Sequence, residues 1–99
     1  MKKEKVQISQ PMRGKTEEQV RSERAALVEE LIRQGYEVVD TVLPGFKNEG
    51  NIPVKYLAKS LEFIADVDGV YFMDGWWEAR GCRIEHQVCV DYGVKILKD

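Results

Sequence analysis

Short apolar runs alternate with segments of helical periodicity along the whole chain, and this alternation restricts the possible folds more than any other feature. Strands are expected at Lys5–Ser9, Tyr36–Asp40, Asp68–Met73 and Val94–Leu97. Helices are expected from Thr16 up to Gly35, from Ile52 or Pro53 to Asp66, and from Gly81 to Tyr92. Strands that alternate with helices build right-handed crossovers around a parallel sheet. The predicted fold class is therefore α/β, a three-layer sandwich with a flavodoxin-like or Rossmann-like parallel sheet of four to five strands.

The first helix carries clear local signals. Thr16 followed by Gln19 is a capping-box pattern, and the acidic first turn suits the positive end of a helix. Gly35 is expected to stop this helix. Residues 41 to 51 show no periodicity and are expected to be irregular.

The length and the net charge of the chain limit its domain organisation and its possible partners. The chain has 99 residues, which predicts a single domain over residues 1–99. Its net charge of −2 leaves no basic excess for a phosphate backbone, so we expect no nucleic-acid polymer as partner. No apolar run is long enough for a signal peptide or a membrane span, so we expect no membrane partner and a cytoplasmic location.

The cysteines and the single histidine give no sign of a metal site. Cys82 and Cys89 lie seven residues apart on one predicted helix, which is too far for a disulfide within that helix. We expect reduced, half-buried thiols. The chain has no Cys-x-x-Cys pattern, so no metal is expected.

The loop Ser9-Gln10-Pro11-Met12-Arg13-Gly14 joins the first strand to the first helix. The free N–H groups and the dipole at a helix N-terminus attract anions, and Arg13 adds a bidentate donor for phosphate or carboxylate. The loop matches neither the Walker pattern nor Gly-x-Gly-x-x-Gly. The alternative is a plain turn with a solvated arginine.

The segment from Gly75 to Glu85 follows the third strand and opens the third helix. Glu85 is expected about one turn inside that helix, where the dipole favours the ionised form that a covalent nucleophile needs. The alternative is a solvated glutamate paired with Arg80 or Lys95.

Three residues of the segment before Glu85 also have open roles. Asp74 ends the third strand and is either an acid, a base or a hydroxyl acceptor, or simply a turn aspartate. Of Trp76 and Trp77, one is expected to stack on a nucleobase or sugar ring and at least one to be structural.

Together these segments resemble a family of small bacterial and phage proteins, the domain of unknown function 4406. The resemblance rests on three elements in order: Ser9 to Lys15, Asp68 to Trp76, and Ala79-Arg80-Gly81-Cys82-x-Ile84-Glu85. That family is similar to the nucleoside 2-deoxyribosyltransferase and deoxynucleotide N-glycosidase superfamily. The resemblance implies a flavodoxin-like fold, usually dimeric, whose enzymes cleave or exchange the N-glycosidic bond of 2-deoxynucleosides or their monophosphates without a cofactor.

The resemblance also implies roles for particular residues. Glu85 falls on the position of the glutamate that attacks the anomeric carbon, in the retaining-glycosidase scheme. Asp74 is expected to help catalysis. The substrate-binding residues are expected to be Ser9, Arg13, Gly14, Gly75, Trp76, Arg80 and Gly81.

Three positions depart from the pattern of those enzymes. Ser60 stands where many of them carry an aspartate in the second helix, and Ala79 stands where the monophosphate-specific enzymes carry a serine. Arg83 replaces a glycine two residues before their glutamate. The nucleophile position is therefore kept while its neighbours differ.

Three functions follow as hypotheses. The first is an enzyme that cleaves or transfers a deoxyribosyl group, and the second is a non-catalytic module that senses or sequesters a nucleotide derivative. The third is an interaction protein without a ligand, because fold alone does not establish function. A homodimer is expected because an apolar patch is predicted around the tryptophan pair with Phe46, Tyr56 and Tyr92.

Overall fold

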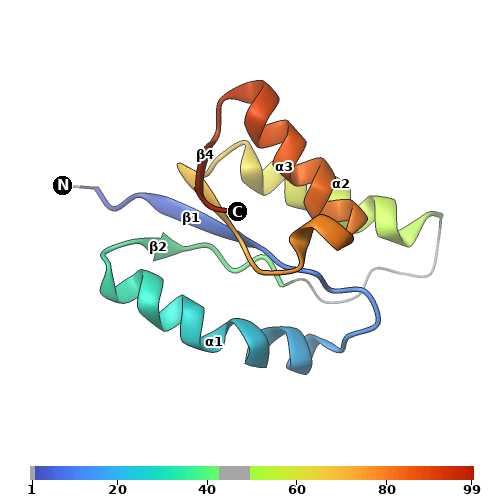
Figure 1. Ribbon diagram of the computed structural model, residues 1–99, viewed down its shortest axis with the longest axis horizontal. Coiled ribbons are helices and arrows are strands. Elements are labelled where there is room, and N and C mark those ends of the chain that lie inside the picture. Colours follow the sequence, from blue (N-terminus) through green and yellow to red (C-terminus); the bar gives the residue numbers. More distant parts are fainter. Residues whose placement is uncertain (1, 43–49) are drawn as a thin grey trace.

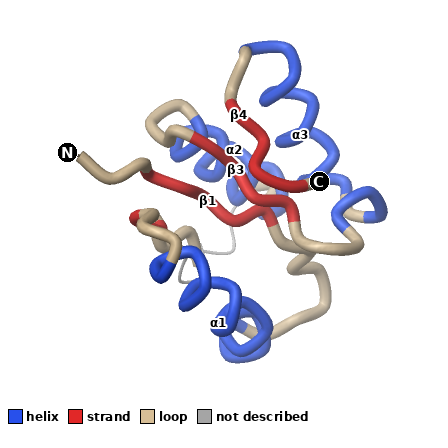
Figure 2. Tube along the Cα trace, turned by 60° about the vertical axis from the view of Figure 1, so that its left-hand side comes forward, coloured by secondary structure: helices blue, strands red, loops and turns tan. Residues whose placement is uncertain are grey.

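The computed structural model describes residues 2–42 and 50–99. Its elements are β1 (Lys5–Ser9), α1 (Glu17–Arg33), β2 (Glu37–Val38), α2 (Ile52–Ile64), β3 (Gly69–Phe72), the 3-10 helix η1 (Trp76–Glu78), α3 (Arg80–Tyr92) and β4 (Lys95–Lys98). The described strands form one parallel sheet in the order β2-β1-β3-β4. Helix α1 covers one face of the sheet, and α2 and α3 cover the other (Figures 1 and 2). The predicted α/β three-layer sandwich is confirmed.

Helix α1 begins as its sequence predicts. The Thr16 hydroxyl accepts from the Gln19 N–H at 3.1 Å, and the Thr16 N–H donates to the Gln19 side chain at 2.8 Å. Gly35 follows the helix with a φ of 96°, a left-handed conformation that glycine adopts without strain. These contacts confirm the predicted capping box and stop signal.

The second strand is shorter than expected. The predicted span Tyr36–Asp40 forms a strand only at Glu37–Val38. Asp40 turns the chain away from the sheet, because its carboxylate accepts from the Val42 N–H at 3.1 Å. Helix α2 likewise ends at Ile64 rather than at Asp66.

The segment after β2 is described only at its ends. Of the irregular residues 41 to 51, residues 43–49, including Phe46, lie outside the described residues. Within the described part of the chain, no helix combines the length and apolar character needed to cross a membrane.

The sheet separates two apolar clusters. Val6, Ile8 and Leu31 form the buried centre of the cluster under α1. The buried centre of the cluster under α2 and α3 consists of Ile64, Val70, Phe72 and Cys89. Because side chains alternate along a strand, β1 gives its apolar residues to the α1 side and turns Gln7 and Ser9 to the other side. One face of the central strand is therefore polar although it is fully buried.

The pairing of β1 with β3 brings the two candidate loops together. Ile8 lies opposite Tyr71 and Ser9 lies opposite Phe72 in the parallel register. Beyond the strands, the Met73 N–H donates to the Ser9 carbonyl at 3.0 Å. A Cβ at Gly75 would lie 4.0 Å from Pro11, so the loops after β1 and β3 run side by side.

The other neighbour of β3 carries an irregularity. Val70 pairs with Ile96 and Tyr71 pairs with Lys98, so Leu97 has no partner in the register. Ile96 and Leu97 pack on opposite faces of the sheet, as neighbouring strand residues do, with Leu97 on the α1 side. Leu97 occupies the space above Gly69, where a Cβ would lie only 2.2 Å from its Cδ1.

Candidate functional site

A cleft with a volume of about 930 Å³ opens at the carboxyl ends of β1 and β3. Among the described residues, its walls come from the loop after β1, the first turns of α1, Thr41 and Val42 after β2, the first half of α2, and the chain from Asp74 into α3. Ligands of open α/β sheets bind at this edge, where the strand order reverses. The volume lies within the usual range for small-molecule sites.

The structure brings most of the predicted site residues to this cleft. The ones that line it are Ser9, Arg13, Asp74, Gly75, Arg80, Gly81 and Glu85. Two predicted binding residues, Gly14 and Trp76, are not among the described lining residues. The spacing of sequence motifs therefore located the cleft but did not separate contacting residues from supporting ones.

Gly14 shapes the first loop. Its φ is 78°, and the Lys15 N–H donates to the Met12 carbonyl at 3.1 Å across the turn. A positive φ at the third position of a four-residue turn is the type II arrangement, which favours glycine there. Gly14 thus turns the chain so that the exposed Arg13 reaches the cleft.

Trp76 takes a structural position instead of the predicted stacking position in the cleft. Its ring stacks on His86 with 4.2 Å between centroids and lies 5.5 Å from the ring of Phe72. It packs against the apolar cluster under α2 and α3. Trp77 is 54% exposed on the outside of η1.

Glu85 lies on α3 and is 8% exposed. Burial raises the pKa of its carboxyl from the ordinary 4.5 to about 7, and interactions with Ser9 and Ser60 offset part of that rise. The sequence places Glu85 where a helix dipole favours the ionised form, but burial acts in the opposite direction. The loss of hydration outweighs the dipole, because α2, α3 and β1 exclude water from most of the side chain.

A polar cluster surrounds Glu85 on the inner side of the cleft. Gly81, which lacks a side chain, lies beside the carboxylate, because a Cβ there would be 3.8 Å from Glu85 Oε1. The Ser9 Oγ is buried without a partner at ordinary hydrogen-bond geometry, and its interaction with the carboxylate lowers the pKa of Glu85. Gln7, which is fully buried, donates through Nε2 to the Ser60 Oγ at 3.1 Å.

Gln7 was not singled out from the sequence, and Ser60 was noted only as a departure from the related enzymes. One signal could have found Gln7, because it is an amide between the apolar residues Val6 and Ile8 of a central strand. A buried polar group needs a hydrogen-bond partner, and that partner had to come from a helix over the same face. The sequence does not say which helix residue this is.

Arg24 supports the α1 wall of the cleft from behind. Its buried guanidinium donates through Nε to the Gln10 side chain at 2.8 Å and through Nη1 to the Thr41 hydroxyl at 3.4 Å. The Gln10 amide in turn donates to the Val20 carbonyl and to Glu23, both at 3.1 Å. Burial lowers the pKa of Arg24. Arg24 thereby ties the loop after β1 to the segment after β2.

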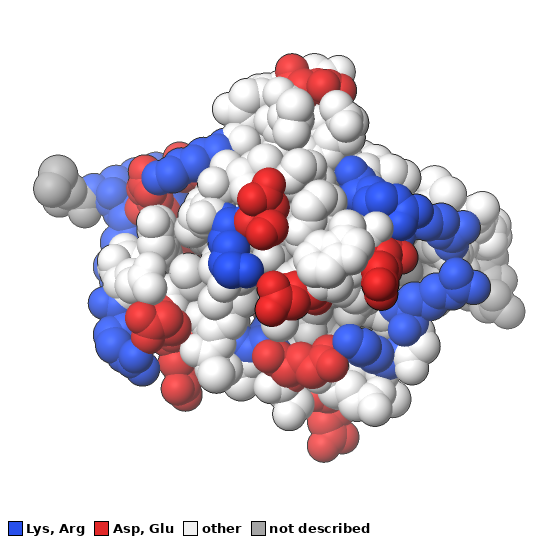
Figure 3. Space-filling view, viewed as in Figure 1, with Lys and Arg blue, Asp and Glu red and all other residues white. Residues whose placement is uncertain are grey.

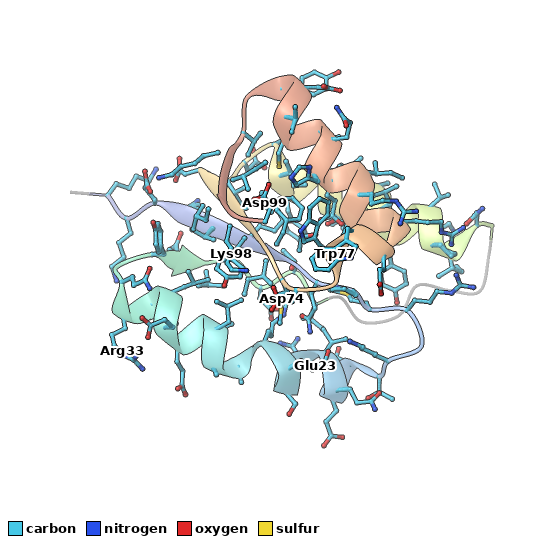
Figure 4. All side chains as sticks on the ribbon, viewed as in Figure 1. Glu23, Arg33, Asp74, Trp77, Lys98 and Asp99 are labelled. Carbon is cyan, nitrogen blue, oxygen red and sulfur yellow. The ribbon has the colours of Figure 1, made fainter. Side chains whose placement is uncertain are left out.

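Charges of both signs lie around the cleft. Lys15 forms an ion pair with Glu23 at 2.9 Å. Asp74 pairs with Lys98 at 3.2 Å, and both residues are labelled in Figure 4. Acidic and basic side chains are interspersed over the face seen in Figure 3. Arg13 and Arg80 are both exposed cations at the cleft.

The N-terminus of α3 opens onto the cleft. Its N-cap residue, Ala79, makes no side-chain capping bond, and residues 79–82 all line the cleft. Uncapped N–H groups at a helix start, together with the helix dipole, favour an anionic or polar ligand atom. With Arg80 in the first turn of the helix, this edge of the cleft suits a negatively charged group.

The two thiols do not fit a reactive role. Cys82 and Cys89 are free, but they are buried rather than half-buried as the sequence predicted. Burial raises the pKa of each to about 11, so both stay neutral near neutral pH and are poor nucleophiles. Within residues 2–42 and 50–99, no three His, Cys, Asp or Glu side chains are grouped to hold a metal ion.

Comparison with known families identifies the chain at the family level. The family model described as Domain of unknown function (DUF4406) matches residues 4–98. The match covers nearly the whole chain, so the protein belongs to this family. No curated protein and no solved structure matches the chain.

Because the pKa of Glu85 is raised, we predict that replacing Glu85 by a neutral residue stabilises the protein in a pH-dependent way. The folded protein holds the Glu85 proton more tightly than the unfolded chain, so stability is lost as the pH rises from 4.5 through about 7. Glu85→Gln keeps the shape and removes the charge. We expect it to raise the free energy of unfolding at pH 8 by about 1–3 kcal/mol and to change it little at pH 4.5.

Urea denaturation of both proteins at the two pH values measures this difference. The exposed Glu62→Gln on α2 is the matched control and should show no such pH dependence. A Glu85→Gln effect of equal size at pH 4.5 and pH 8 would contradict the burial argument.

Proposed function

We propose that this member of the DUF4406 family binds a deoxynucleoside or deoxynucleotide in the cleft and cleaves or transfers its N-glycosidic bond through Glu85. The observation that carries the proposal is a buried carboxylate on the floor of a cleft of nucleotide size, at the switch point of a parallel sheet. The resemblance of its two loops to the nucleoside 2-deoxyribosyltransferase-like superfamily supports the same chemistry.

The proposed reaction proceeds in two displacements. An ionised Glu85 oxygen attacks the anomeric carbon, the bond from that carbon to the base breaks, and the base leaves with the bonding electrons and takes up a proton. Water, or the nitrogen of a second base, then attacks the same carbon and releases the carboxylate. Asp74, which lines the cleft and pairs with Lys98, is the proposed proton donor and acceptor.

The cleft offers separate surfaces for the two ends of such a ligand. Arg13, Arg80 and the uncapped start of α3 suit an anionic or hydroxyl-rich end. The apolar side chains in the first half of α2, including Ile52, Pro53 and Leu57, suit the flat face of a base. In this proposal α2 supplies the contact that was predicted for Trp76.

The second candidate function is a non-catalytic module that senses or sequesters a nucleotide derivative. Two observations favour it. The pKa of Glu85 near 7 leaves a large fraction of the carboxyl protonated at neutral pH, and a protonated carboxyl is a poor nucleophile. Ser60 and Ala79 occupy positions where related enzymes carry helper side chains. For either function, the buried free thiols favour the reducing cytoplasm.

Release of free base from a panel of deoxynucleosides and their monophosphates tests the catalytic proposal. We expect the wild-type protein to release base from at least one member, and Glu85→Gln to release none. Because the ionised form attacks, kcat/KM should fall about tenfold per pH unit below pH 7 and level off above it. Chromatography of timed reactions measures the base.

The outcomes separate the two functions. Tight binding of a panel member without base release at any pH would support the non-catalytic binding module and rule out the enzyme. Base release by Glu85→Gln at the wild-type rate would remove Glu85 from the mechanism.

Arg13 provides a test that holds for both functions. Charge-assisted contacts to an anionic ligand group are worth on the order of 1.5–3 kcal/mol. Arg13→Ala should therefore weaken binding roughly ten- to a hundredfold, with a larger loss for a monophosphate than for its nucleoside. Because Arg13 is exposed, the loss should shrink at high salt.

The matched control for Arg13 is Arg33→Ala. Arg33 lies at the far end of α1 and is exposed, and in the described part of the chain its ion pair is with Glu30 on the same helix. Calorimetric titration of both variants should show an effect for Arg13 alone. Equal and small effects would make the loop after β1 a turn without a binding role.

We also propose that the protein is a homodimer. Apolar side chains are exposed along η1 and α3, among them Trp77, Ile84, Val90 and Tyr92, the last of which is 79% exposed. Tyr56 is half-buried on α2 and lines the cleft instead. Exposed large apolar side chains on neighbouring elements are typical of an interface.

Light scattering at micromolar concentration tests the assembly. We expect twice the mass of the chain, and Trp77→Glu with Tyr92→Glu should shift it to the monomer. The control is the exposed Ile32→Glu on α1, which should leave the dimer intact. A monomeric mass for the wild-type protein would refute the proposal.

A further inference from the structure

Arg24 is a buried cation that the proposed reaction does not use. It belongs to α1, is 5% exposed, and is not among the described residues that line the cleft. In the described part of the chain its side chain donates to two neutral side chains, those of Gln10 and Thr41, and its buried Nη2 has no partner. A buried guanidinium with no carboxylate bonded to it is costly, and an apolar residue would avoid this cost. Its retention therefore calls for a purpose other than stability.

The side-chain amide of Gln10 is held in one orientation. The Arg24 Nε, which can only donate, lies 2.8 Å from Gln10 Oε1. The Val20 carbonyl, which can only accept, lies 3.1 Å from Gln10 Nε2, and Glu23 Oε1 lies at the same distance from this nitrogen. The donor and the acceptors thus agree on which end of the amide is oxygen. Both polar atoms of Gln10 are paired within the protein, although the residue lines the cleft.

Glu23, labelled in Figure 4, binds both ends of the loop after β1. Its Oε1 accepts from Gln10 Nε2 at 3.1 Å and from Lys15 Nζ at 2.9 Å. Between these two points, the Lys15 N–H donates to the Met12 carbonyl at 3.1 Å and closes the turn whose second residue is Arg13. The loop that carries Arg13 is therefore anchored at its start, across its turn and at its end.

We infer that Arg24 is a positioning residue, which acts through Gln10 to hold the loop after β1 so that Arg13 is presented to an anionic group in the cleft. The contact of Arg24 with Gln10 is the buried part of the anchor, whereas the ion pair of Lys15 with Glu23 is partly exposed and contributes less. An ordered loop binds more tightly than a mobile one, because it loses less conformational entropy on binding. The inference deepens the proposed function and rests on it for the anionic ligand, but the order of the loop requires no ligand.

NMR relaxation of the full-length protein without a ligand tests the order of the loop. We expect backbone N–H order parameters of about 0.85 for residues 12–14 in the wild-type protein, as in rigid backbone, and values below about 0.6 in Arg24→Met. Gln10→Met, which removes all three contacts of the amide, should give the same loss. Residues 73–75 in the loop after β3 should keep their wild-type values, which separates a local effect from a general loosening of the fold.

Arg21→Met is the matched control for Arg24→Met. Arg21 belongs to the same helix, but its guanidinium binds the segment after β2, through the Asp40 carboxylate and the Val42 carbonyl, both at 3.3 Å. The variant should leave the order of the loop after β1 unchanged. An equal loss of order in Arg21→Met would mean that the segment after β2 holds the loop, and this result would contradict the inferred route through the amide.

Titration with 2-deoxyribose 5-phosphate, the part that all deoxynucleotide monophosphates share, tests the consequence for binding. Arg24→Met should raise its dissociation constant about tenfold, because the loop must then be ordered on binding. Since Arg24 acts through the loop that presents Arg13, Arg13→Ala should cost less affinity in the Arg24→Met protein than in the wild-type protein. Independent, additive losses would contradict the inference.

Two further results overturn the inference. One is an unchanged order of the loop in folded Arg24→Met, and the other is an unchanged affinity for the sugar phosphate in a variant whose loop has become mobile. Should Arg24→Met not fold, Gln10→Met gives the same comparison. Failure of the wild-type protein to bind the sugar phosphate would refute the anionic end of the cleft in the proposed function, and the relaxation data would still decide whether Arg24 orders the loop. Binding without base release from any deoxynucleotide would rule out the proposed enzyme and leave the role of Arg24 in place.

Discussion

The parallel pairing of β1 with β3 is the constraint on which the rest of the site depends. Strands β1 and β3 are separated by some sixty residues, yet Ser9 lies opposite Phe72 in register. Because both strands run the same way, the chain leaves each of them at the same edge, and the following helices diverge to opposite faces of the sheet. The cleft lies between the two chain segments that leave β1 and β3 toward these helices. Without the register, Arg13 and Glu85 would be unrelated residues on two loops.

The same pairing creates an energetic conflict in the centre of the molecule. The side of β1 that faces α2 and α3 carries Gln7 and Ser9, and α3 adds the Glu85 carboxyl to the same buried space. Apolar side chains would pack there at lower free energy, since a buried carboxyl is costly to ionise and a buried amide needs partners. A protein retains such groups where they serve a purpose other than stability. This is why the polar floor of the cleft, rather than its exposed rim, carries the strongest indication of function.

The sequence was sufficient for the architecture because the signals involved are local or periodic. The capping box at Thr16 and the alternation of strands with helices depend on neighbouring residues alone, and both were predicted correctly. The short β2 was mispredicted because the Asp40 turn competes with pairing at a sheet edge. The packing of Trp76 and the burial of Glu85 could not be predicted for a different reason, since burial is a property of the packed molecule. A tryptophan after a strand gives the same sequence pattern whether it faces a ligand or packs on His86. A helix glutamate likewise gives the same sequence pattern whether it is solvent-exposed or buried.

The two edges of the sheet bear on how copies of this chain meet. An exposed strand edge with unpaired N–H and C=O groups invites another strand, which leads to open-ended aggregation. Here β2 is only two residues long, and β4 begins and ends with a lysine and has a bulge at Leu97. Charged side chains and a local kink make β4 a poor template for a further strand, and β2 is too short to be one. Growth of the sheet from copy to copy is thus disfavoured at both described edge strands, which leaves the helical faces as the surfaces for association in solution.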